Sequence, residues 1–256
     1  MTFPIQATNA FYYYADLERA WQFYTNILGL ETAADYGFAK ILKLAQASYL
    51  TLVDAEKGMH SVDEPKTTTI AFVTDQVADW YTYLQEAGVV IERPFTIKEG
   101  SGHDGFVALD PEGYFLEFEV FNPHAENEIL LPALSSVPHI FSASGKRPAH
   151  LGVQATVQWL YYDDIPAVQA FYEALFGVTM IADQGWAKIY RFSESGLIGL
   201  VDGRRGLHKV TEQKCVTVSF FTNDVESWFN KAKGIPNIRM RSEEVEEEYG
   251  RVRLFV

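Results

Sequence analysis

The stretch that decides the fold occurs twice, as Asp35-Tyr-Gly-Phe-Ala-Lys-Ile41 and again as Asp183-Gln-Gly-Trp-Ala-Lys-Ile189. The two copies lie 148 residues apart, and the correspondence extends without a gap over Thr8–Trp80 and Thr156–Trp228. Within these ranges 26 of 73 positions are identical, whereas unrelated chains of average composition would share roughly four or five. The chain is therefore a duplication, with a period far longer than the roughly 20–50 residues of solenoid repeats.

The duplication predicts two domains of ordinary size. We place the first domain at residues 1–122, a linker at 123–150 and the second domain at 151–256. Four prolines mark the linker, and apolar residues such as Leu130 indicate that part of it packs on a domain. The second copy ends at Val256, before the segment that would correspond to the last strand of the first domain. We therefore expect that strand beyond Val256.

The composition is that of a globular chain with an acidic surface. Hydrophobic residues make up 48% of the 256 residues, and the formal net charge is −13. This charge argues against nucleic acid as a partner, because phosphates require a basic surface. No apolar run is long enough to span a membrane, and we expect neither a membrane partner nor a secretory signal, hence a cytoplasmic location. The single cysteine, Cys215, excludes an internal disulfide.

Each copy divides again into two similar modules. Helices of equal length are predicted to begin at Asp16 and Asp75 and to end at Gly29 and Gly88, because Asp caps helix starts and Gly favours helix ends. Strand-like segments surround the helices, so that a module consists of a strand, a helix and three more strands. The predicted strands of the first domain are Ala10–Tyr14, Phe38–Leu44, Tyr49–Val53, Thr67–Thr74, Val89–Phe95, Gly105–Leu109 and Tyr114–Phe121. The fold class is α+β.

Two motifs carry a resemblance to a known family. They are Asp16-Leu-Glu-Arg-x-x-x-Phe23-Tyr24-x-x-x-Leu28-Gly29 and Asp110-Pro-Glu-Gly-Tyr-Phe-Leu-Glu117. Together they resemble the opening and closing segments of the vicinal oxygen chelate superfamily, which includes glyoxalase I, bleomycin-resistance proteins, fosfomycin-resistance enzymes and extradiol dioxygenases. The resemblance implies tandem glyoxalase-like domains, each built of two paired βαβββ modules that form an open antiparallel cup.

The resemblance also implies where a metal would bind. Family enzymes place His or Gln on the first strand, often His before the second helix, and Glu on the last strand. The corresponding positions here are Asn9 and Val157, Thr69 and Thr217, and Glu117. Because Asn and Thr are poor ligands for a transition metal, we expect no metal and no other cofactor. The alternative is a divalent metal held through Glu117 and ligands not yet placed.

Aromatic residues on the first strands are the better candidates for a ligand site. Strand alternation places Asn9, Phe11 and Tyr13 on one face, and aromatic walls bind planar or apolar molecules. If the family register holds, the ligand-binding residues are Asn9, Phe11, Tyr13, Phe38, Thr69, Glu117, Trp159, Tyr161 and Trp186. In this interpretation Asn9 and Glu117 are the polar anchors of the first cup. The alternative is that the aromatic residues only fill a core.

Two further residue types recur in both copies. His60 and His208 lie in Gly-x-His loops and are interpreted either as ligands or bases, or as loop residues that hold the backbone. Lys40 and Lys188 lie on strands and are interpreted either as facing solvent or an acidic partner, or as lining a cup.

These observations predict a protein of the bleomycin-resistance type that binds a small organic molecule in an aromatic-lined cup without a metal, and no residue is assigned a catalytic role. The alternative is a metal-dependent lyase or ring-cleaving dioxygenase of the same superfamily. A third interpretation makes the second domain structural, because Val157 replaces the polar residue of the first copy. A homodimer or a pairing of the two domains within one chain is expected.

Overall fold

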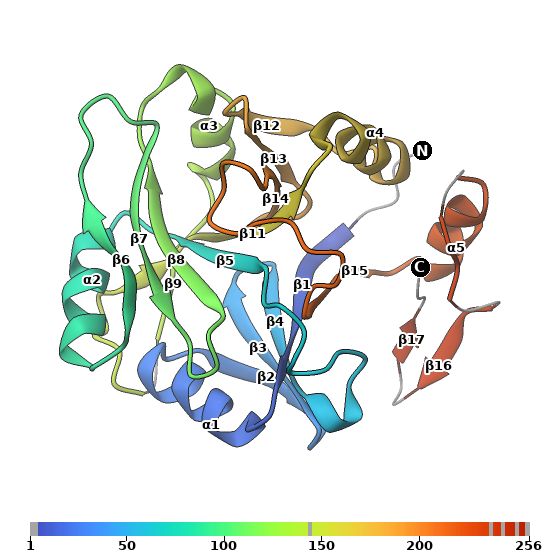
Figure 1. Cartoon of the computed structure of the whole chain (residues 1–256), viewed down its shortest axis with the longest axis horizontal. Helices are drawn as coiled ribbons and strands as arrows, with labels where there is room; N and C mark the ends of the chain where they lie inside the picture. Colours follow the sequence, from blue (N-terminus) through green and yellow to red (C-terminus); the bar gives the residue numbers. More distant parts are fainter. Residues whose placement is uncertain (1–4, 143–144, 236–237, 242–243, 249–250, 254–256) are drawn as a thin grey trace.

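The computed structural model describes residues 5–142, 145–235, 238–241, 244–248 and 251–253. In it the chain is α+β, as predicted, with two large sheets and helices packed around them (Figure 1). Within the described residues, no helix is long and apolar enough to cross a membrane.

The elements of the first half form two successive modules. The first module contains β1 (Ile5–Tyr14), α1 (Leu17–Gln22), a π-helical turn (Phe23–Ile27), β2 (Glu31–Asp35), β3 (Ala39–Ala45) and β4 (Ser48–Asp54). After a 3-10 turn (Ala55–Lys57), the second module contains β5 (Thr68–Val73), α2 (Val77–Glu86), β6 (Ile91–Thr96), β7 (His103–Leu109) and β8 (Phe115–Phe121).

The linker and the second half continue the same order of elements. The linker contains a 3-10 turn (Ala125–Asn127), α3 (Leu130–Leu134) and β9 (Ile140–Phe141). The third module contains β10 (Gly152–Val153), β11 (Ala155–Tyr162), α4 (Ile165–Phe176), β12 (Met180–Asp183), β13 (Ala187–Arg191) and β14 (Gly196–Asp202). The fourth contains β15 (Val216–Thr222), α5 (Val225–Lys233), β16 (Glu246–Glu248) and β17 (Arg251–Arg253).

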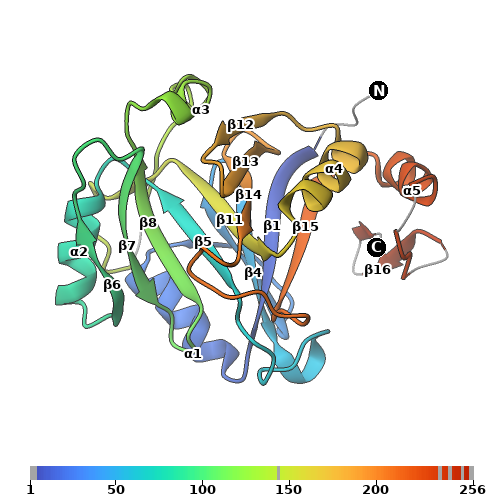
Figure 2. The same ribbon diagram turned by 45° about the horizontal axis from the view of Figure 1, so that its top comes forward.

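The two sheets each combine modules from different halves of the chain. The five-stranded sheet has the order β15-β1-β4-β3-β2, and the eight-stranded sheet has the order β12-β13-β14-β11-β5-β8-β7-β6. Figures 1 and 2 show β15, from the fourth module, beside β1. The expectation that the two modules of one half share a cup is therefore wrong. The first strands of modules in opposite halves pair antiparallel, β1 with β15 and β5 with β11, so the halves are joined by continuous hydrogen bonding.

The central core is built from both sheets and from the helices α1 and α2. It contains buried side chains from both, such as Tyr12 and Leu50 of one sheet and Phe72 and Phe118 of the other. Polar contacts also cross the core, since the Gln158 amide donates to the Tyr12 hydroxyl at 3.2 Å. Because these faces are packed together, the opposite face of each sheet is the one that can carry a site.

Helix ends follow the predicted chemistry where the caps were expected. The Asp16 side chain accepts from the Arg19 N–H and caps α1, and Gly29 adopts the left-handed φ of 62° that ends the helical segment. The second helix begins later than predicted, because Gln76 rather than Asp75 is the residue before its first turn. Strand β2 was not among the predicted ranges, because its sequence, Glu-Thr-Ala-Ala-Asp, has weak strand propensity.

The linker packs on the body of the molecule, as predicted. Leu130 and Leu134 of α3 are buried in a cluster with residues of β8, β11 and β13. The Gln154 amide donates to the backbone carbonyls of Leu134 and Val137, at 3.0 and 3.1 Å. The linker therefore closes one end of the eight-stranded sheet.

Candidate functional site

The predicted site residues lie on two separate faces. The Asn9 face is the side of the five-stranded sheet that carries Asn9, Phe11, Tyr13, Thr51, Thr217 and Ser219. The Glu117 face is the side of the eight-stranded sheet that carries Thr69, Phe115, Glu117, Glu119, Val157, Trp159 and Tyr161. The prediction that Asn9 and Glu117 anchor one cup is wrong, because β1 and β8 belong to different sheets.

The Asn9 face is a closed network of hydrogen bonds. Asn9 is buried, with 3% of its surface exposed. Its amide N–H donates to Ser219 Oγ at 3.0 Å, and its amide oxygen accepts from Thr51 Oγ1 at the same distance. Both polar ends of Asn9 are therefore occupied by the protein itself, which leaves it a structural residue in this arrangement.

A tyrosine on the Asn9 face meets a histidine and a threonine from distant parts of the chain. The Tyr13 hydroxyl lies 2.8 Å from Thr217 Oγ1, and the Tyr13 ring meets the His60 ring edge-on at 4.8 Å. A Cβ on Gly58 would collide with the Tyr13 ring, so the Gly-x-His spacing lets the loop approach the tyrosine. His60 is held by Glu64, with 2.6 Å between Nδ1 and Oε2.

The Glu117 face repeats this contact with the halves exchanged. The Tyr161 hydroxyl lies 3.0 Å from Thr69 Oγ1, and the Tyr161 ring meets the His208 ring edge-on at 5.0 Å. A Cβ on Gly206 would collide with Tyr161. Here the second neighbour of the histidine is an aromatic ring, Phe115 at 4.2 Å. Both histidines thus contact the face tyrosines, a contact that neither interpretation of the sequence had included.

Glu117 lies in the middle of a row that crosses the eight-stranded sheet. The row runs over neighbouring strands through Arg93, Val107, Glu117, Ala71 and Val157. Burial raises the pKa of Glu117 to about 7, against the opposing influences of the Arg93 charge and the Trp159 indole N–H. A carboxyl group in this state exchanges its proton near neutral pH.

A second carboxyl group lies two residues further along β8. Glu119 is 2% exposed, and its pKa is raised well above the usual range, first by burial and then by the charge of Glu117. Because side chains two apart on a strand share a face, Glu117 and Glu119 are neighbours. Their proximity opposes ionisation of both groups together.

Several buried polar atoms on or beside the Glu117 face lack partners. Within the described residues, no hydrogen-bond partner exists for Glu119 Oε1, His103 Nδ1, His208 Nε2 or Trp159 Nε1. The Trp159 N–H lies close enough to Glu117 to lower the pKa of that carboxyl group, but it does not reach standard hydrogen-bond geometry. Burial lowers the pKa of His208 to about 4, although a hydrogen bond with the Thr68 backbone acts in the opposite direction. This ring is therefore neutral at physiological pH. Unpaired buried donors and acceptors are uncommon in folded proteins, so this cluster calls for an explanation.

Trp159 covers the apolar part of the same face. It is 6% exposed, and its ring lies so close to Gly199 that a Cβ there would collide with it. The corresponding residues on the Asn9 face are Phe11 and Thr51. The exchange of Thr for Gly therefore makes room for the larger indole.

The remaining predicted residues lie at the margins of the sheets. Phe38 packs against the central core, and Trp186 packs against the cluster on the Glu117 face, with the Arg205 guanidinium 5.8 Å from its ring. Lys40 and Lys188 do not line a cup. They pair with Asp35 and Asp183 on the helix-covered side of the sheets, as in the first of their two interpretations.

The family's metal chemistry does not fit the donors present. The three expected positions on the Glu117 face hold Val157, Thr69 and Glu117, which supply one carboxylate and no imidazole. On the Asn9 face, the amide of Asn9 is already engaged. Throughout the described part of the chain, no three His, Cys, Asp or Glu side chains are grouped as metal ligands.

Comparison with known proteins finds a family of similar sequence and solved structures of similar fold. Residues 7–118 match the model of the Glyoxalase/Bleomycin resistance protein/Dioxygenase superfamily. The first half of the chain is therefore similar in sequence to this superfamily. The second half shares the glyoxalase-like fold, since the structure is similar over most of its length to glyoxalase I from Zea mays, with 18% identity and a TM-score of 0.57. That match covers 88% of this chain and 77% of the maize chain.

A second solved structure supports the same fold. A protein from Bacillus subtilis described as a proposed dioxygenase matches with 15% identity and a TM-score of 0.57, covering 91% of this chain and 74% of that chain. The comparison with curated proteins finds no match. At these identities the glyoxalase-like similarity establishes the fold, and the reaction has to be argued from the site.

Proposed function

We propose that the chain binds a small planar organic molecule on the Glu117 face, with a donor group of the ligand directed at Glu117 and without a bound metal. The observation that carries the proposal is the cluster of unpaired buried polar atoms on this face. A ligand with hydrogen-bonding groups would satisfy these atoms, which the described protein groups do not.

The aromatic residues of the face support a planar ligand. Trp159, Tyr161 and Phe115 supply rings around the carboxyl groups. Such rings favour flat molecules through burial and stacking, and they favour a cation near their faces. The carboxyl groups of Glu117 and Glu119 outnumber the neighbouring cation, Arg93. A ligand with a protonated nitrogen is therefore preferred over an anion.

A calorimetric titration with 4-aminoquinoline, a planar cation, tests the proposal. We expect Glu117→Gln to weaken binding about tenfold or more, because a charge-assisted hydrogen bond becomes a neutral one. The matched control is Tyr49→Leu, which gives the Asn9 face the residue found at position 197 and should change the affinity less than twofold. Equal affinity of the parent and Glu117→Gln would refute the proposal.

The superfamily's metal-dependent enzymes suggest the second candidate, a lyase or ring-cleaving dioxygenase. One observation favours it: Glu117 occupies the family's closing motif and has a pKa near neutrality. This candidate predicts near-stoichiometric iron, manganese, nickel or zinc in the purified protein, lost in Glu117→Ala. A metal content far below one per chain would leave the metal-free binder as the better candidate.

Other predictions stay open to separate tests. The domain boundaries at residues 122 and 151 can be tested by limited proteolysis. A homodimer can be tested by analytical ultracentrifugation, and the cytoplasmic location by fractionation of cells.

A further inference from the structure

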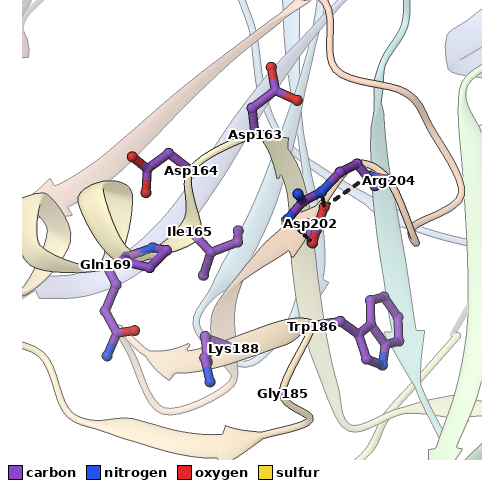
Figure 3. Close-up of a pocket in the computed structure, with 10 residues that line it drawn as sticks. Asp163, Asp164, Ile165, Gln169, Gly185, Trp186, Lys188, Asp202 and Arg204 are labelled. Carbon is purple, nitrogen blue, oxygen red and sulfur yellow. Dashed lines mark hydrogen bonds and ion pairs between the residues drawn. The ribbon is translucent and has the colours of Figure 1, made fainter.

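A surface pocket of about 560 Å³ lies at the start of α4, outside the Asn9 face and the Glu117 face. Figure 3 shows Gln169 and Lys188 at one end of this pocket, the Arg204–Asp202 ion pair at the other, and Trp186 along its side. Pockets of this size accommodate small molecules.

The counterpart of this pocket in the first copy is occupied by a side chain. There Trp21 of α1 lies beneath Lys40, with 4.8 Å between Nζ and the ring centroid. The Trp21 indole N–H donates to Thr32 Oγ1 at 2.9 Å. Lys40 also pairs with Asp35 at 2.6 Å, so the lysine has one ionic and one aromatic neighbour.

The second copy keeps the ion pair and loses the ring. Lys188 pairs with Asp183 as Lys40 does with Asp35, but the residue corresponding to Trp21 is Gln169. The Gln169 amide is turned along the helix and donates to Glu173 Oε1 at 3.0 Å. The space that the indole fills in one copy is therefore part of the pocket in the other.

We propose that this pocket binds a planar aromatic molecule of indole size, in the place that the Trp21 side chain takes in the first copy. The ring of the ligand would lie against the Lys188 ammonium group, as Trp21 lies against Lys40. The neighbouring Trp186 would add a stacking surface.

The charges of the lining set the class of ligand further. Three carboxylates, those of Asp163, Asp164 and Asp202, face two basic groups, those of Lys188 and Arg204. Arg204 is engaged by Asp202, with 2.7 Å between Nη2 and Oδ2. A neutral or positively charged aromatic molecule therefore suits the pocket better than an anionic one.

The test uses the whole chain and 5-fluoroindole, observed by ¹⁹F NMR titration. We expect one binding site in the parent protein. Gln169→Trp should fill the pocket as Trp21 does and weaken binding at least tenfold, while thermal unfolding shows that the variant remains folded. The reciprocal change, Trp21→Gln, should open the counterpart and add a second site.

Further variants separate this pocket from the Glu117 face. Lys188→Met should weaken binding of 5-fluoroindole about threefold, as expected from the loss of a cation–π contact. Undiminished binding in folded Gln169→Trp would overturn the proposal. If Glu117→Gln abolished binding instead, the probe would be occupying the Glu117 face, and the pocket proposal would fail while the proposed function stood.

Discussion

On the Asn9 face the polar side chains satisfy one another, whereas on the Glu117 face they do not. Both faces keep the contact of a tyrosine with a threonine and a histidine from distant segments. The two faces also differ at Asn9 and Thr51, which are hydrogen-bonded to each other and are replaced by Val157 and Gly199 on the Glu117 face. This comparison teaches that the duplication preserved the contact of tyrosine, threonine and histidine on both faces, while it kept the hydrogen-bonded pair of Asn9 and Thr51 on one face only.

The largest expected effect is a difference in unfolding free energy between substitutions of Trp159 and of Phe11, the aromatic residues at corresponding positions of the two faces. Trp159→Ala should lower the free energy of unfolding by about 3–5 kcal/mol, because it leaves a cavity beside Gly199. Phe11→Ala should cost about 1–2 kcal/mol, because Phe11 is only half-buried. Urea denaturation measures both values, and equal losses would contradict the claim that only the Glu117 face is tightly filled by its aromatic residue.

The next effect is a pH dependence specific to the Glu117 face. The Glu117 carboxyl has a pKa of about 7 in the folded chain and about 4.5 when unperturbed, so the folded state holds the extra proton between these values. The contribution of Glu117 to stability should therefore fall as pH rises from about 4.5 to 7, by up to about 3 kcal/mol, and level off above.

The urea midpoint at pH 5 and pH 8 measures this slope. Glu117→Gln should reduce it. Glu64→Gln is the control, because hydrogen bonds from His60 and Ser61 outweigh burial and lower the pKa of Glu64, so its effect appears only at acidic pH. If stability had the same pH dependence in Glu117→Gln and in the parent, the pKa of Glu117 would not be raised in the folded chain.

A smaller effect should be common to both faces. Tyr13→Phe and Tyr161→Phe each remove a hydroxyl that meets a threonine. Each should cost about 1 kcal/mol of unfolding free energy. Thermal denaturation compares the two variants, and a difference of several kcal/mol between them would break the equivalence of the two contacts.

The smallest effect concerns the repeated ion pairs. Asp35→Asn and Asp183→Asn each remove the partner of a strand lysine. Because both carboxylate side chains are about half exposed, each change should cost less than about 1 kcal/mol. A larger loss of unfolding free energy, measured by chemical denaturation, would show that these ion pairs stabilise the edges of the sheets.

The sequence predicted the order of elements well because that order depends on local chemistry. Asp16 caps a helix and Gly29 ends the helical segment, and both act within a few residues. The pairing of β1 with β15 depends on contacts between segments more than 200 residues apart, which no local pattern reports. For the same reason the sequence did not place Asn9 and Glu117 on different sheets.

Part of the site was predictable and part was not. Glu119 follows Glu117 by two residues on a predicted strand, so strand alternation alone could have placed it on the same face. Arg93 reaches the row of Glu117 only through the register of β6 on β7. The hydrogen bond between Tyr161 and Thr69 likewise needs the pairing of β11 with β5.

The most direct test of the Glu117 face is the indole N–H signal of Trp159 in a ¹H–¹⁵N NMR spectrum, recorded with and without 4-aminoquinoline. The five tryptophans give few indole signals, and each can be assigned by substitution with Phe. We predict that the Trp159 signal shifts on saturation, because its N–H lies beside Glu117, while the Trp21 signal stays in place. A Trp159 signal that does not move while the ligand binds elsewhere would contradict the proposal that this face is the binding site.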